Sequence, residues 1–135
     1  MKNQRVIFLF HYVTGLVDFL TGIFLVIAPS WTLRLMHVKA RDEASELVSY
    51  IGVFVFAVGA SHFLAGDFPQ NEVSKERWKT LWKVSSLVRF SVAFFVFWQV
   101  FIGHLELMWL SVALTDLSVA TIFVFFLCTK PFEQR

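Results

Sequence analysis

The chain has 135 residues, of which 57% are hydrophobic, 18% aromatic and 16% charged, and its formal net charge is +2. A soluble domain of this length does not carry so large an apolar fraction, so the composition indicates an integral membrane protein. The small net charge gives no indication of a nucleic-acid partner. A single cysteine, Cys128, excludes an intrachain disulfide and any CxxC redox or zinc motif.

Four apolar runs are each long enough to form a helix that crosses a bilayer, which needs about 20 residues. We predict spans at about 6–29, 47–66, 81–103 and 106–129. After the first run, residues 30–38 are short and amphipathic, and Trp31 is a suitable interfacial anchor. The sequence therefore predicts an all-α fold: one integral membrane domain over 1–135, an antiparallel bundle of four transmembrane helices with an interfacial half-helix after the first.

Small and polar residues form a stripe on the first two spans. The first span has a polar stripe at steps of three and four, with His11, Asp18 and small residues such as Gly15 and Gly22 on one face. In the second span Gly52, Gly59 and Gly66 recur at heptad spacing. Such a glycine seam favours close packing of the second helix on the first. A glycine-lined ligand groove is the alternative.

Polar connections separate the later spans. We predict a loop from Asp67 to Lys79, with a turn at Pro69-Gln70-Asn71. The short connection Gly103–Glu106 predicts that the third and fourth helices form an antiparallel hairpin.

The distribution of Lys and Arg predicts the orientation of the chain. With four spans, one side of the membrane holds only Arg34, Lys39 and Arg41. The other side holds the remaining positive charges near the membrane: Lys2, Arg5, Lys75, Arg77, Lys79, Lys83, Lys130 and Arg135. The positive-inside rule then places both termini on the cytoplasmic side of the plasma (inner) membrane. Trp78 and Trp82 are expected at the inner interface, and Trp31 and Trp109 at the outer one.

Three ionisable residues fall near the middle of different spans: Asp18, Arg89 and Asp116. A charged side chain at the centre of a membrane helix costs roughly 2.5 to 3.5 kcal/mol on insertion scales, so each needs a partner, a proton or a wet cavity. Because one guanidinium can bind two carboxylates, we expect the three to converge. A structural ion-pair triad, a ligand pocket and a proton path all remain open for this cluster.

The four histidines fall into two groups by depth. His11 and His62 lie near the cytoplasmic ends of adjacent helices, and His37 and His104 lie near the outer ends. Either pair has the geometry to ligate a haem or a metal, but no spacing motif supports such a site. We therefore predict no metal and no cofactor, and we keep His11 and His62 with Asp18, Arg89 and Asp116 as candidate ligand-binding residues.

Two stretches carry a family resemblance: Gly22–His37, with its Ala28-Pro29 step, and Ile51–Gly59, with glycine at both seam positions. They resemble the small four-helix DoxX-like membrane proteins of bacteria, over roughly the first half of the chain. The resemblance implies an integral membrane bundle, sometimes associated with quinone-linked or redox partners, and transfers no catalytic or cofactor residue. The architecture is also similar to that of the four-helix sterol-isomerase bundles, which hold buried acids.

Three functions are compatible with these features. The first is an accessory or interaction subunit that packs against itself or a larger membrane complex. The second is a binding protein or enzyme for a hydrophobic small molecule (a quinone, isoprenoid or lipid) held near Asp18, Arg89 and Asp116. The third is a proton-coupled carrier subunit that works as an oligomer. The sequence contains neither a Gly-x-Ser-x-Gly elbow nor a phosphate loop, which favours a non-enzymatic role without deciding it.

Overall fold

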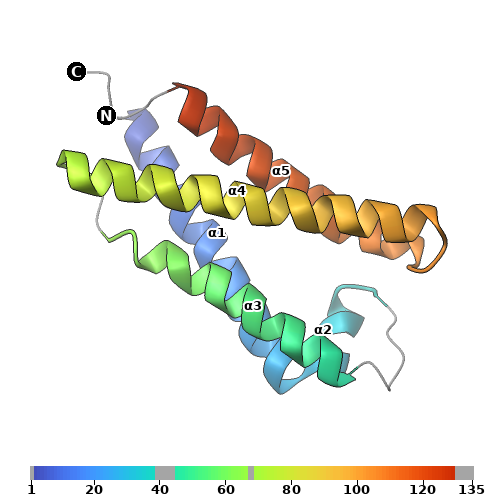
Figure 1. The fold of residues 1–135 in the computed structure, drawn as a ribbon. Helices are drawn as coiled ribbons and strands as arrows, with labels where there is room; N and C mark the ends of the chain where they lie inside the picture. The colour runs from blue at the N-terminus through green and yellow to red at the C-terminus, as the bar shows by residue number, and fades with distance from the viewer. Residues whose placement is uncertain (1, 39–44, 67–68, 130–135) are drawn as a thin grey trace. The chain divides into compact units, whose positions relative to one another are not determined.

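The computed structural model describes residues 2–38, 45–66 and 69–129, and these ranges contain helices and no strands. Four helical segments are long and apolar enough to cross a membrane: Arg5–Ile27, Glu46–Phe63, Glu72–Phe101 and Leu107–Thr129. The all-α class and the four long apolar helices are thereby confirmed (Figure 1). The charges predicted to form the first polar loop, between Lys39 and Glu43, and the C-terminal charges Lys130 and Arg135 lie outside the described residues.

The chain forms two compact units, Met1–Leu64 and Ala65–Arg135. The first contains α1 (Lys2–Ile27), α2 (Pro29–Leu35) and α3 (Ser45–Phe63). The second contains α4 (Glu72–Phe101), the short 3₁₀ helix η2 (Leu107–Trp109) and α5 (Leu110–Thr129). Each unit is a helical hairpin with its own interface, and the single domain over 1–135 stays a prediction.

Glycines bring α1 and α3 into backbone contact. A Cβ atom added at Gly22 would lie 2.3 Å from the backbone nitrogen of Phe56, and one added at Gly59 would lie 2.2 Å from that of Phe19. At Gly52 the added atom would meet Leu25 at 2.7 Å. No side chain fits at any of these positions, so the predicted close contact of the second helix on the first is confirmed.

The third glycine of the predicted seam does not take part in this packing. α3 ends at Phe63, and Gly66 follows it with a φ of +70°. The extension of the second span to Gly66 was therefore wrong. This glycine serves the turn after the helix, because a left-handed backbone is strained for residues with a side chain.

The predicted half-helix after the first span is present as α2. Pro29 stands in its first turn, where the missing N–H of proline costs nothing. At its end the N–H of Val38 donates to the carbonyl of Leu33, and the N–H of His37 to that of Arg34. This is a Schellman cap, with His37 in the left-handed position at a φ of 57°. The seven-residue α2 is too short to span a membrane.

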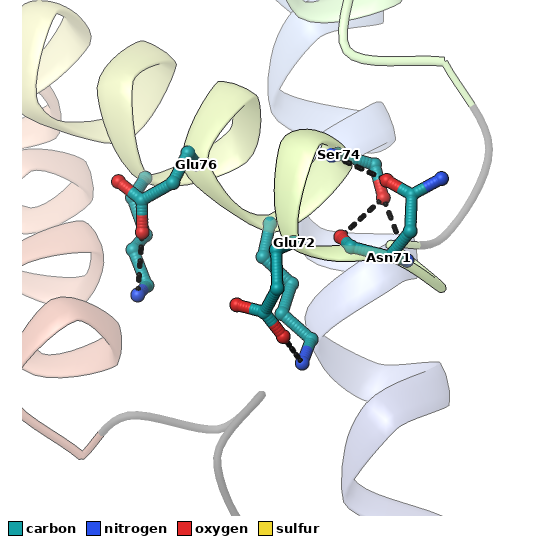
Figure 2. Close-up of polar contacts among 6 residues, drawn as sticks. Asn71, Glu72, Ser74 and Glu76 are labelled. Atoms are coloured by element: carbon teal, nitrogen blue, oxygen red, sulfur yellow. Dashed lines mark hydrogen bonds and ion pairs between the residues drawn. The ribbon is translucent and has the colours of Figure 1, made fainter.

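α4 begins much earlier than expected. Residues 72–79, predicted as loop, form its first two turns, and the whole helix has 30 residues. Figure 2 shows the reason: Asn71 and Ser74 form a reciprocal capping box, with Ser74 N–H donating to Asn71 Oδ1 at 2.8 Å. The polar residues that suggested a loop supply this cap and two ion pairs along the helix, Lys75–Glu72 and Lys79–Glu76.

The length of α4 exceeds the thickness of a bilayer core. At 1.5 Å per residue a helix of this length measures roughly 45 Å, whereas the hydrocarbon layer is about 30 Å thick. A helix of this length that stands perpendicular to the membrane extends about ten residues beyond that layer. The first turns of α4, from Glu72 to Lys79, are charged and are therefore the part of the helix best suited to contact with water.

α4 and α5 pack side by side as an antiparallel hairpin, as predicted (Figure 1). Ala93, Val96 and Ala113 form a buried core between them. Nearer the other end, Trp82 stacks on Phe123 of α5 with ring centroids 6.0 Å apart. Trp78 and Trp82 are both fully buried, and their position at the inner interface stays a prediction.

The glycine packing can be tested with a leucine at position 22. We expect Gly22→Leu to lower the free energy of unfolding by about 1–3 kcal/mol, because the new side chain collides with the backbone of Phe56. Reversible SDS unfolding in mixed micelles, followed by circular dichroism, measures the change. Ala57→Leu is the control because Ala57 is exposed on α3. Equal stability of the two variants would contradict close packing at Gly22.

Candidate functional site

Arg89 and Asp116 form an ion pair between α4 and α5. Nη1 of Arg89 donates to Oδ1 of Asp116 at 2.5 Å. The arginine side chain is 6% exposed and the carboxylate 18%. Nε of Arg89 also lies 3.4 Å from Oγ of Ser85, one turn earlier on α4. The predicted approach of these two charges at mid-span is therefore observed.

Small residues allow the two charged side chains to meet. On α4, the buried face around Arg89 carries Ser85, Ser86 and Ala93, and on α5 Asp116 stands between the buried Ala113 and Ala120. Ser86 also approaches the carbonyl oxygen of Ala120, at 3.4 Å. Because these side chains are short, the helices come close enough for the pair to form a direct hydrogen bond. Ser85 was not among the predicted site residues, although its place four residues before Arg89 marks it as a neighbour.

Asp18, the third predicted member of the cluster, lies in the other unit. It is half-buried on α1, on the face that packs against α3, where its backbone lies beside Gly59. The convergence of Asp18 with Arg89 and Asp116 stays a prediction, as does the pairing of His37 with His104. His104 Nδ1 lies 3.1 Å from Oε1 of Gln99.

His11 and His62 form a second buried polar contact, between α1 and α3. Their Nδ1 atoms are 3.2 Å apart, and Nε2 of His11 lies 3.0 Å from the backbone oxygen of His62. The two side chains are 0% and 1% exposed. They were predicted to lie on adjacent helices at similar depth, and the structure places their rings in direct contact.

Gly15 makes room for this histidine contact. A Cβ atom built on Gly15 would lie 2.5 Å from Cβ of His62. Any side chain at position 15 would displace His62 from α1. The ring of Tyr12 lies 5.4 Å from that of His11 in an edge-on arrangement. The histidine pair therefore belongs to the same close interface as the glycine contacts.

An apolar hollow lies on the second unit, away from the ion pair. It has a volume of about 500 Å³ and is open to the surroundings. Its lining consists of Phe94, Phe97, Trp98, Val100, Phe101 and Leu110. Phe94 is five residues beyond Arg89 and Leu110 six before Asp116, which corresponds to roughly 7.5 to 9 Å along the helices. Neither charged residue lines the hollow.

Arg89 and Asp116 neutralise each other's charge. The guanidinium and carboxylate satisfy each other's charge in a low-dielectric setting, where an unpaired charge is costly. Among residues 2–38, 45–66 and 69–129, no group of three or more His, Cys, Asp or Glu side chains could hold a metal ion. The ligand-binding role predicted for the five candidate residues remains untested.

Comparison with known proteins adds no functional assignment. No family model matches the sequence, and searches of curated proteins and of solved structures find no significant match. The resemblance of the first half to DoxX-like proteins therefore stays a prediction.

The ion pair can be tested by removing its members singly and together. We expect Arg89→Leu and Asp116→Leu each to lower the free energy of unfolding by about 3–5 kcal/mol, because each leaves a buried charge without a partner. The double variant should be more stable than either single variant, since no charge then remains. The SDS-unfolding midpoints of all three report the coupling.

Lys83→Leu is the matched control, because Lys83 is exposed on α4. Its loss should change stability by no more than about 0.5 kcal/mol. Additive effects of the two single substitutions would show that Arg89 and Asp116 do not act as a pair.

Proposed function

We propose that this chain is an accessory or interaction subunit of the plasma membrane, in which buried polar groups join helices to one another. The observation that supports this most directly is the Arg89–Asp116 ion pair, which lies inside the α4–α5 interface. A charge pair used in this way specifies which helices meet and in which register. It performs that role without a bound ligand.

The outward faces of the second unit are suited to contact with lipid or with other membrane helices. Exposed hydroxyl residues include Ser91 on α4 and Thr115, Ser118 and Thr121 on α5. Each hydroxyl donates to the carbonyl four residues earlier, at 2.7 to 2.9 Å: Ser91, Thr115, Ser118 and Thr121. Because these polar atoms are satisfied within their own helices, the faces can meet an apolar partner without an unpaired donor.

The proposed orientation places both termini in the cytoplasm. Lys75, Arg77 and Lys79 stand on the first turns of α4. Clustered Lys and Arg next to a span favour the cytoplasmic side. The connection between α4 and α5, which carries no Lys or Arg from Ile102 to Glu106, then faces the opposite side.

Cysteine labelling tests this orientation. In a Cys128→Ser background, Glu106→Cys should react with a membrane-impermeant maleimide in intact cells, because Glu106 is exposed at the outer end of the hairpin. Glu72→Cys should react only after the membrane is permeabilised. The reverse pattern would contradict the proposed orientation. Labelling of both positions in intact cells would show that residues 72 and 106 do not lie on opposite sides of the membrane.

A hydrophobic small molecule is the second candidate function, and the apolar hollow favours it. Six apolar side chains surround the hollow, and four of them are aromatic. Such a surface suits a quinone ring, an isoprenoid or an acyl chain. The DoxX-like resemblance, with its quinone-linked partners, leads to the same class of ligand.

Native mass spectrometry from membranes separates the two candidates. For an interaction subunit we expect complexes whose mass exceeds that of the single chain by at least one further protein chain. An adduct of a few hundred daltons on the single chain would instead support the small-molecule function. Trp98→Ala should then remove that adduct, whereas Phe63→Ala, at an exposed position outside the hollow, should leave it. A bare single chain would contradict both candidates.

A further inference from the structure

The first turns of α4 carry more positive than negative charge. Residues 72–83 contain four positive side chains and two negative ones, which leaves a net charge of +2. The positive side chains are Lys75, Arg77, Lys79 and Lys83, and the negative ones are Glu72 and Glu76. The N-terminal end of a helix dipole adds positive potential in the same place. This end of α4 therefore favours an anionic neighbour.

Two of the four positive charges are paired within the helix itself. Each lysine of these pairs lies 2.5 or 2.9 Å from the carboxylate of a glutamate three residues earlier (Figure 2): Lys75–Glu72 and Lys79–Glu76. In the part of the chain that the structure describes, neither Arg77 nor Lys83 forms an ion pair with an acidic side chain. Both side chains are exposed. Arg77 and Lys83 are therefore the two cations that can neutralise an anion outside the chain.

Arg77 and Lys83 lie on one exposed face of α4. Arg77, Thr80 and Lys83 follow each other at steps of three and are all exposed. Val84 and Leu87 continue this face towards the middle of the helix, and they are 54% and 68% exposed. The face therefore changes from charged to apolar within about two turns, as a surface does where it crosses from lipid headgroups into acyl chains.

The length of α4 places both cations at the depth of the headgroups. An upright helix crosses the hydrocarbon core, which is about 30 Å thick, in about 20 residues. α4 ends at Phe101, whose apolar side chain is 82% exposed. Counted back from Phe101, the hydrocarbon layer ends at about Trp82. Lys83 then stands at the boundary, where its long side chain extends outwards, and Arg77 stands about 7.5 Å beyond Trp82, in the headgroup layer.

We propose that Arg77 and Lys83 bind the headgroup of an anionic phospholipid, whose acyl chains lie along Val84 and Leu87. A zwitterionic headgroup carries an ammonium group that cancels its phosphate, so the net positive charge of this region favours an anionic lipid. A soluble phosphate would match the two cations but would leave the apolar part of the face unused. The inference depends neither on the accessory role nor on the leaflet that this end of α4 faces.

Native mass spectrometry of the purified protein in detergent tests the lipid preference. With dioleoylphosphatidylglycerol and dioleoylphosphatidylcholine added in equal amounts, we expect the phosphatidylglycerol complex to dominate. Arg77→Gln/Lys83→Gln should reduce this preference about 25-fold, because each cation near an anionic lipid surface contributes about fivefold. Equal binding of the two lipids by the unmodified protein, or a preference that survives in the double variant, would overturn the proposal.

Two control variants separate these charges from general effects. Glu72→Gln/Lys75→Gln removes one charge of each sign from the same turns and should keep the preference. Arg77→Lys/Lys83→Arg keeps both positive charges and should also keep it, which distinguishes loss of charge from loss of fold. Loss of the preference in either control would contradict the assignment to Arg77 and Lys83.

A competition experiment distinguishes a lipid from a soluble phosphate compound. Glycerol 3-phosphate in excess presents the phosphate without acyl chains, so it should leave bound phosphatidylglycerol in place. Displacement of the lipid by glycerol 3-phosphate would show that the cations bind soluble phosphates, and it would overturn the proposed lipid site.

Discussion

Close backbone packing between helices is the constraint on which the rest of this structure depends. Lipid tails are as apolar as the side chains they would replace, so hydrophobic burial does little to bring two membrane helices together. In the first unit, Gly15, Gly22, Gly52 and Gly59 let α1 and α3 approach until backbone meets backbone. In the second, Ser85, Ser86, Ala93, Ala113 and Ala120 allow a similar approach of α4 and α5. Association then relies on dispersion and on buried polar contacts.

The two units place a polar contact within these tight interfaces by different chemistry. Arg89 and Asp116 form a charge pair at mid-span. This pair contributes to the specificity of helix packing as well as to stability, because any other helix register would separate the two charges. His11 and His62 form a polar contact close to the end of α3.

Several features followed from sequence, and others were missed for identifiable reasons. The heptad spacing of Gly52 and Gly59 correctly indicated the face that meets α1, and the charges of Arg89 and Asp116 correctly indicated a partnership. Gly66 continued the spacing but belongs to a turn. The polar composition of residues 72–79 suggested a loop, although Asn71 and Ser74 carry a capping box that starts a helix. Trp78 and Trp82 have the residue type of interfacial anchors, and the structure adds that both are fully buried and that Trp82 stacks on Phe123.

The sequence by itself determined the class of protein, the number of long apolar helices and the residues that cannot face lipid. It did so because hydropathy and chain length are properties of single segments, and the cost of a charge in hydrocarbon does not depend on its neighbours. Only the tertiary structure decided that the rings of His11 and His62 are in contact, that Gly15 leaves the space for His62, and that Arg89 does not line the hollow. These features depend on how closely two helices approach each other, and no single segment encodes that distance.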